Sequence, residues 1–245
     1  MDVVGERFRP TRPDSREVME RLQAEIAAEA TFEDAAELAP ADVSSGDALV
    51  AGVDQAFLDD RAVSAVVVLR GGEVIARESA VTPLSMPYVP GLLAFREGEP
   101  IVAALAALDV DPDLLVLDGS GRIHYREAGL ATHVGVCFDV PAVGVAKNLL
   151  CGRPRRTTDA LGAGERVPIE ADGSMSAPDG TVVGYAYQSR QYPDSTRINP
   201  LYVSPGHRLA AGTATDLVAA CGGEYKLPRP TRLADRYADE LKPGR

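Results

Sequence analysis

Three carboxylates stand in sequence settings where a charge needs a partner. Asp54 ends the apolar run LVAGV at 49–53, Asp118 follows the apolar run LLVL at 114–117, and Glu97 lies early in a segment rich in Ala and Leu. An ionised carboxylate in apolar surroundings is costly unless it is paired or binds a metal ion. Mg²⁺ prefers a few carboxylates, completed by water and substrate phosphate. If the three acids meet, they predict a site that activates water against a phosphodiester.

Each of these acids has a simpler interpretation when it is taken alone. Asp54 is also consistent with a strand-end residue that faces solvent or pairs with an Arg. Asp118 precedes Gly119, so it is also typical of a turn, although a carboxylate at the carboxyl end of a parallel strand is where α/β sheets place their sites. Glu97 fits an acid in the first turn of a helix, where the macrodipole favours it.

Three further residues are candidates for substrate contacts. Lys147 ends the apolar strand VGVA at 143–146 and either supplies a point charge for phosphate or extends into solvent. Tyr88 lies in the rigid segment PYVPG at 87–91, as a surface residue or as a wedge that fills the space left by an extruded base. His207, in SPGHR, follows a strand; a lone His is more often structural than catalytic.

The elements that would position these residues begin with an antiparallel meander. Strands are predicted at 49–54, 62–69 and 73–81, with Arg70-Gly71-Gly72 as a hairpin turn. A helix at 92–108, a strand at 114–118, a helix at 126–138 and a strand at 141–146 follow, and this alternation predicts parallel pairing. If the first strand lies beside the one ending at Asp118, the two aspartates converge and the helix brings Glu97 over them.

The flanking segments complete the predicted domain. We expect a helix at 14–30, a connector at 31–47, a surface excursion at 152–180, strands at 182–188 and 201–203, and helices at 213–221 and 231–241. Together the elements predict an α/β fold that resembles a ribonuclease H-like mixed sheet, in which three antiparallel strands are followed by parallel strands, flanked by helices. We expect a single domain over 1–245, with the N-terminal helix and connector at 1–47 and a catalytic core at 48–240.

Composition excludes several classes of protein. The chain has 245 residues, 45% of them hydrophobic, and it has neither an apolar signal-like start nor a run of about 18 apolar residues that could span a membrane. Its three cysteines include no CxxC pair, so neither a zinc site nor a disulfide framework is predicted. We expect a cytoplasmic monomer that does not associate with membranes.

The net charge of −11 argues against a general nucleic-acid binder, which usually has a basic surface. A site that holds divalent ions on carboxylates is itself acidic, however, and the ions bring positive charge to phosphate. Only three of the 25 basic residues are lysine. Excess acid with Arg in place of Lys resembles proteins of salt-loving organisms, in which salt screens surface repulsion. Because salt also weakens phosphate contacts, we expect binding to depend on metal, stacking and pocket contacts.

Several long segments together resemble the endonuclease V family, in the order in which that family has them. They are VAGVDQAF (50–57), MPYVPGLLAFRE (86–97), PDLLVLDGSGRIH (112–124), GLATHVGVCFDVPAVGVAK (129–147), NPLYVSPGHR (199–208) and KLPRPTRLADRYA (226–238). The resemblance covers most of the chain from about 48 to 240. It implies a ribonuclease H-like fold, Mg²⁺ or Mn²⁺ as cofactor, and cleavage of the second phosphodiester 3′ of hypoxanthine to leave a 3′-hydroxyl and a 5′-phosphate.

The resemblance also implies roles by position. Asp54 and Asp118 match the family's metal-binding aspartates and Glu97 its third acid, while Lys147 would contact phosphate and His207 would assist the metal or water. The remaining matches would bind substrate, with Tyr88 as the strand-separating wedge in its loop and Leu93 in the lesion pocket: Tyr88, Pro90, Gly91, Leu93, Gly119, Gly121 and His124.

Three positions depart from the family's usual pattern. Ser120 stands where many members have His, Tyr-Arg-Glu follows His124 where a more basic run is common, and Gly212 stands where some members have Asp. The expected partner is DNA that contains deoxyinosine. An inosine-specific ribonuclease remains an alternative, because the 2′-hydroxyl contact cannot be read from sequence. A non-cutting nucleic-acid-binding protein on the same fold is the third reading, and the intact acidic set argues against it.

Overall fold

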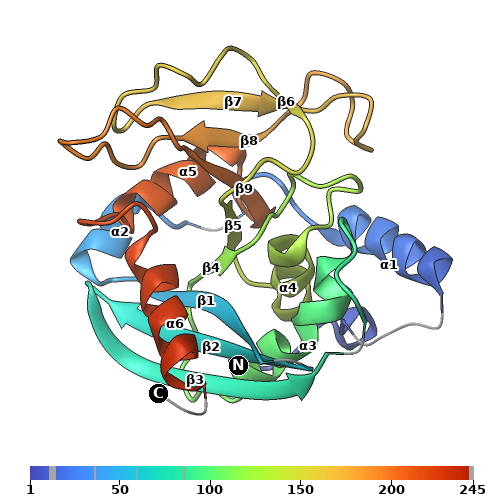
Figure 1. Ribbon diagram of the computed structural model, residues 1–245. Helices are drawn as coiled ribbons and strands as arrows, with labels where there is room; N and C mark the ends of the chain where they lie inside the picture. The colour runs from blue at the N-terminus through green and yellow to red at the C-terminus, as the bar shows by residue number, and fades with distance from the viewer. Residues whose placement is uncertain (11–14, 36, 59, 85, 243–245) are drawn as a thin grey trace.

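The computed structural model describes residues 1–10, 15–35, 37–58, 60–84 and 86–242. All strands in these residues join one mixed sheet in the order β3-β2-β1-β4-β5-β9-β8-β7-β6 (Figure 1). The strands are β1 (Leu49–Leu58), β2 (Arg61–Arg70), β3 (Glu73–Pro83), β4 (Leu114–Asp118), β5 (Ala142–Ala146), β6 (Arg153–Pro154), β7 (Arg166–Glu170), β8 (Val182–Tyr187) and β9 (Leu201–His207). The helices are η1 (Glu6–Phe8), α1 (Arg16–Glu29), α2 (Pro40–Ser45), α3 (Leu93–Ala106), α4 (Leu130–Phe138), α5 (Ala211–Ala220) and α6 (Arg229–Glu240).

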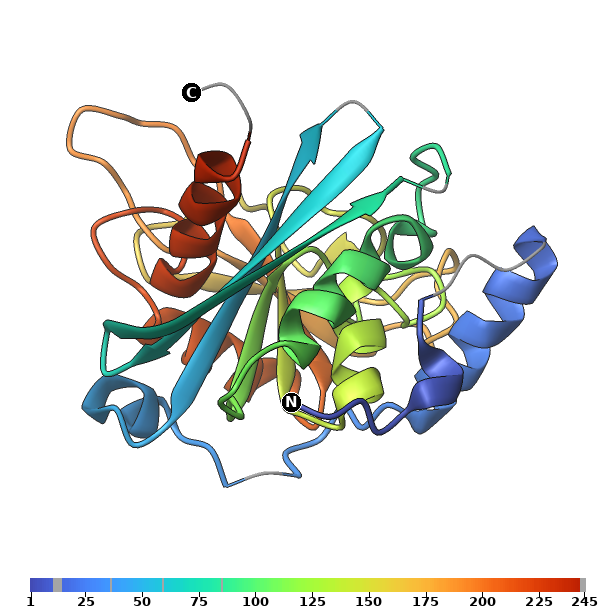
Figure 2. The same cartoon turned by 90° about the horizontal axis from the view of Figure 1, so that it is seen from below.

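The predicted meander is confirmed: β1 pairs antiparallel with β2, and β2 with β3. Residues 62–69 of β2 are buried throughout because helices cover both faces of the sheet. Val67 and Leu69 pack against α6, whereas Val66 and Val68 belong to the core on the α3 side. Figure 2 shows α6 on one face and α3 with α4 on the other. A strand buried on both faces therefore reads as a continuous apolar run.

The parallel part of the sheet is also confirmed. β1 pairs parallel with β4, and β4 pairs parallel with β5. Gly52 in β1 allows α6 to cross closely, since a Cβ at this position would lie 2.1 Å from the Pro230 carbonyl carbon. Helix α4 starts at Leu130 rather than at 126, because Glu127 adopts a left-handed backbone conformation with φ 52°.

Three predictions about the flanking segments need correction. The segment 152–180 is not only a surface excursion: it contains β6 and β7, which extend the sheet beyond β8. Alternation explains this, because Val167 and Ile169 point into a core cluster. The connector at 31–47 contains the short helix α2, and β9 continues to His207 rather than ending at 203.

The remaining predicted elements are present. Helix α1 begins after Ser15, whose side chain accepts a hydrogen bond from the Val18 amide; residue 14 of the predicted helix lies outside the described residues. Helices α5 and α6 and strand β8 lie within two residues of their predicted bounds. Within the described parts of the chain, none of the helices is long and apolar enough to cross a membrane.

Candidate active site

The sheet brings Asp54 and Asp118 together. Val53 of β1 pairs with Leu117 of β4 in the parallel register. The next residues of the two strands, Asp54 and Asp118, therefore lie side by side at the edge of the sheet where β4 ends. Helix α3 covers this edge and places Glu97 there. Asp54 is 7% exposed and Glu97 8%, and the charge of Asp118 acts on both side chains. Asp54 and Asp118 therefore lie side by side, as predicted, with Glu97 near Asp118; that the three acids hold a metal ion stays a prediction.

The electrostatics of these acids indicate a shortage of positive charge. Burial raises the pKa of Asp54 to about 8, and the neighbouring charge of Asp118 adds to the rise. Burial likewise raises the pKa of Glu97 to about 7, although Arg96 opposes this from 3.5 Å between Nε and Oε1. Buried acids that repel one another bind protons or cations more readily than exposed acids do.

The residues present fit a hard divalent ion. Asp54 Oδ1 accepts a hydrogen bond from the Gln55 amide at 2.7 Å, but Oδ2 is buried and without a hydrogen-bond partner in the described structure. Among the described residues there is no group of three or more His, Cys, Asp or Glu side chains that could hold a metal ion. Mg²⁺ does not require one, because it keeps several waters and uses one or two carboxylates plus substrate phosphate.

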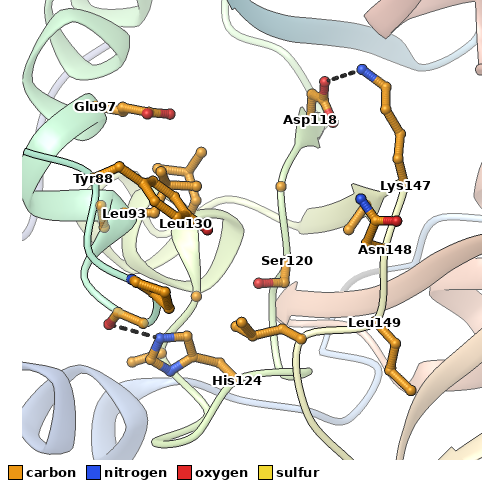
Figure 3. A pocket seen from close by; sticks show the side chains of 18 of the residues that line it. Tyr88, Leu93, Glu97, Asp118, Ser120, His124, Leu130, Lys147, Asn148 and Leu149 are labelled. Carbon is orange, nitrogen blue, oxygen red and sulfur yellow. Dashed lines mark hydrogen bonds and ion pairs between the residues drawn. The ribbon is translucent and has the colours of Figure 1, made fainter.

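Lys147 points into this acidic site, as predicted. Its Nζ lies 2.9 Å from Asp118 Oδ2 (Figure 3). Hydrogen bonding and charge from Asp118, with further charge from Asp54 and Asp235, outweigh burial and raise the pKa of Lys147. The ammonium therefore stays charged beside Asp118.

Sequence reasoning missed a fourth acid, Asp235. Its charge raises the pKa values of both Asp54 and Lys147, so this residue of α6 lies close to the site from the opposite face of the sheet. The available signal was its place in the segment KLPRPTRLADRYA, which carries part of the family resemblance.

A cavity of about 490 Å³ opens beside the acids. Glu97 and Tyr88 lie on the α3 side, and Asp118 and Lys147 lie across from them (Figure 3). Most of the predicted substrate-binding residues line this cavity: Tyr88, Pro90, Gly91, Leu93, Gly119 and His124. Tyr88 is 59% exposed, as a side chain that contacts an external ligand would be. The cavity also includes Gln23 of α1, a helix to which the sequence assigned no role.

Two donors hold the loop that carries Tyr88. The Gly91 carbonyl accepts from Gln23 Nε2 at 2.7 Å and lies 3.0 Å from His124 Nε2. His124 Nδ1 accepts from the Arg126 amide, so Nε2 carries the proton. Burial lowers the pKa of His124 to about 4, which keeps the ring neutral. Gly91 has φ +80°, and a Cβ there would lie 2.9 Å from the Tyr125 ring. The loop is thus fixed to α1 and to the His124 turn.

The prediction for His207 is wrong. Strand β9 runs antiparallel to β5 and pairs Val203 with Val145 but His207 with Ala142, so His207 lies at the end of the sheet away from Asp118. Its Nε2 lies 3.0 Å from Asp139 Oδ1, and its Nδ1 accepts from the Thr31 amide. Burial lowers its pKa despite Asp139. His207 therefore joins the segment after α1 to the end of α4.

The prediction for Gly121 also needs correction. Its amide donates to Ser204 Oγ at 2.9 Å, and a Cβ there would lie 2.3 Å from the Pro205 carbonyl oxygen. Gly121 is therefore required by close packing against β9 and does not line the cavity beside the acids.

A sheet of this order, with one acid in the middle of β1 and another at the end of the adjacent parallel strand β4, defines the class of ribonuclease H-like nucleases. The chain belongs to the endonuclease V family, whose model matches residues 32–236, and it is accordingly a nuclease.

Relatives and solved structures support this membership. The chain is 75% identical to the endonuclease V of the halophilic archaeon Natronomonas pharaonis, with 99% of this chain and 98% of the relative covered. The solved endonuclease V of Streptomyces avermitilis is 34% identical, covers 93% of each chain and has a TM-score of 0.78. Endonuclease V of Ciona intestinalis, solved with a DNA containing an inosine followed by a ribo-adenosine, is 25% identical, with 91% and 95% covered and a TM-score of 0.72.

Proposed function

We propose that this protein is a Mg²⁺-dependent endonuclease, also served by Mn²⁺, that recognises hypoxanthine in DNA and cleaves the second phosphodiester 3′ of the lesion. The observation that carries the proposal is the convergence of Asp54, Glu97 and Asp118 beside a cavity lined by Tyr88 and Gly91. The Ciona relative, solved with inosine-containing DNA, supports the choice of ligand.

The proposed chemistry assigns the acids to the ion and Lys147 to the phosphate. Asp54 and Asp118 would hold the ion, with Glu97 and Asp235 as further acceptors for the ion or its waters. The ion supplies an activated water and stabilises the leaving 3′ oxygen. Lys147, already held at Asp118, would place its charge on the scissile phosphate.

The proposed recognition assigns the cavity to the extruded base. Tyr88 would fill the space left in the strand, since a stiff aromatic side chain replaces the stacking that the base gives up. Leu93 and Gly119 offer the base an apolar surface and a close backbone approach. Neutral His124 and Gln23 hold the loop through the Gly91 carbonyl, and neither side chain adds a charge to the pocket. Residues 48–58, 60–84 and 86–240 would then form the catalytic core, and residues 1–10, 15–35 and 37–47 would support the cavity.

The test is nicking of a labelled duplex that contains a single inosine, compared with the same duplex containing adenine. We expect a cut at the second phosphodiester 3′ of inosine with Mg²⁺ or Mn²⁺ and none with a chelator. Asp54→Asn should remove nicking, whereas Asp179→Asn, an exposed acid on the β7–β8 side, should not. Equal cutting of both duplexes, or unchanged nicking by Asp54→Asn, contradicts the proposal.

Two further arms of the same assay test which sugar the substrate carries and which salt concentration the enzyme requires. An inosine-containing RNA matched to a thymine-free DNA decides between deoxyribonuclease and ribonuclease, because the two strands then differ only in the 2′-hydroxyl. A series from low to molar salt tests the proposal that the enzyme works in a salt-rich interior, as the acidic composition and the halophilic relative suggest. Full activity and stability at low salt would count against the halophilic assignment.

A further inference from the structure

Positive charge is unevenly distributed in this acidic chain. The net charge is −11, yet residues 188–236 contain seven basic and four acidic side chains. Strand pairing brings two of the three lysines, Lys147 and Lys226, to the same part of the sheet: Ala146 pairs with Tyr202 of β9, Leu201 pairs with Tyr187 of β8, and Ser189 just beyond β8 donates to the Lys226 carbonyl. Burial, and then the charges of Arg197 and Lys147, lower the pKa of Lys226. A group of cations therefore continues from the active-site lysine onto the surface formed by the β8–β9 loop and the segment before α6.

These cations lack the counter-ions that most others have. Arg155 and Arg166 pair with Glu170 and Asp216, and Lys242 pairs with Asp239. Within the described ranges, neither the Lys226 ammonium nor the Arg197 guanidinium has an acidic partner within salt-bridge distance. Cations left free by an acidic protein are available for an external anion.

Exposed tyrosines alternate with these cations. Arg232 lies over the Tyr225 ring at 4.0 Å, and Arg190 lies over the Tyr192 ring at 5.3 Å. Tyr225 is 51% exposed and Tyr192 44%. An aromatic face beside a cation is the arrangement that single-stranded nucleic acid uses for stacked bases and phosphates.

The surface is held in shape by contacts between its two segments. Ser189 Oγ donates to the Lys226 carbonyl at 2.7 Å, and Arg190 Nη1 donates to the Gly223 carbonyl at 3.4 Å. A cavity of about 200 Å³ lies between them, lined by Tyr187, Gly222, Tyr225 and Lys226 among others. Figure 1 shows the β8–β9 loop and the segment before α6 lying on the same side of the molecule.

We propose that Lys226, Arg197 and Tyr225 form a binding track for the substrate strand on the 3′ side of the cut. The inference rests on the proposed function. The base would occupy the cavity lined by Tyr88 and His124, and the scissile phosphate would lie at Asp118 and Lys147. Lys226 lies outside that cavity, beyond the ends of β9 and β8 that adjoin Lys147, so the strand that continues past the cut would meet it next.

The track also fits an enzyme that binds DNA in high salt. Phosphate contacts by Lys226 and Arg197 weaken as salt rises, because less free energy is gained from counter-ion release. Stacking on Tyr225 does not depend on that release. A track that combines the two keeps part of its affinity where a purely basic surface would lose it.

The experiment uses the full chain and inosine-containing single strands with either two or ten nucleotides beyond the cut. For the wild type we expect kcat/KM to be about tenfold higher with the long 3′ flank. In Lys226→Ala/Arg197→Ala, and separately in Tyr225→Ala, this ratio should fall toward one. Arg70→Ala, which removes an exposed cation at the end of β2, should keep the wild-type ratio.

Salt dependence gives a second readout. The slope of log Kd against log salt should decrease by about 0.7 for each phosphate contact removed from a single strand, and Tyr225→Ala should leave the slope unchanged while weakening affinity. The track is refuted if kcat/KM of the wild type does not depend on the length of the 3′ flank. It is also refuted if the variants change the dependence on the 5′ flank instead. A wild type that does not nick inosine-containing strands at all refutes the proposed function, whereas anisotropy with the same oligonucleotides still reports on the track.

Discussion

Replacing Gln23 by leucine removes one of the two donors that hold the Gly91 carbonyl. The Gln23 amide is 1% exposed and donates at 2.7 Å, and its Oε1 accepts from Arg126 Nη1 at 3.4 Å. The nearly isosteric change leaves His124 as the remaining donor to Gly91. One buried neutral hydrogen bond contributes about 0.5–1.5 kcal/mol. If that free energy positions the Tyr88 loop, kcat/KM on an inosine duplex should fall about two- to twelvefold.

The double variant Gln23→Leu/His124→Leu gives the sharper result. It leaves the buried Gly91 carbonyl with neither of its present donors, and an unsatisfied buried acceptor costs about 1–3 kcal/mol. The two substitutions should therefore reduce kcat/KM by more than the product of their separate effects. Single-turnover nicking at subsaturating enzyme measures this coupling, and the thermal midpoint measured in the same salt detects general loss of structure.

Glu25→Ala is the matched control, because Glu25 is exposed on the same helix. It should leave nicking unchanged. The reasoning is refuted if Gln23→Leu nicks as the wild type does, or if the two substitutions are independent. It is also refuted if Gln23→Leu lowers the thermal midpoint without changing kcat/KM, since Gln23 then only stabilises the fold.

Three further predictions concern other parts of the molecule. Asp235→Asn should raise the metal concentration needed for half-maximal nicking by about 10- to 100-fold, whereas Glu240→Gln, exposed on the same helix, should not; equal metal titrations would remove Asp235 from the site. Burial lowers the pKa of His133 to about 4, below its unfolded value near 6.5, so stability present above pH 6.5 should be lost as the pH falls toward 4. Urea unfolding should show a lower free energy of unfolding at pH 4.5 than at pH 7.5, and in His133→Gln this difference should be smaller by up to about 3 kcal/mol. The same difference in the wild type and the variant would contradict the role of His133. His207→Gln should lower stability by about 1–3 kcal/mol through its contacts with Thr31 and Asp139 but keep nicking within about twofold; a large loss of kcat at unchanged stability would return His207 to the active site.

The local sequence was sufficient to predict most of the helices and strands. The Val-rich run in β2 and the fully apolar run in β4 predicted strands, and the alternation of strands with helices predicted the parallel pairs. The approach of Asp54 to Asp118 was predicted on the condition that the first strand lies beside β4, and the structure shows that pairing. The strand β7 was missed because its short alternation, Val167 and Ile169, lies among polar and glycine residues that are typical of loops.

The sequence by itself determined which side chains this protein has for the chemistry: three acids at strand and helix positions, and one lysine after β5. Tertiary structure decided which other residues join them. The antiparallel direction of β9 carries His207 away from the site, and the packing of α6 across Gly52 brings Asp235 toward it. Strand direction and helix crossing depend on contacts between residues far apart in the chain, so neither is encoded in the pattern of a single segment.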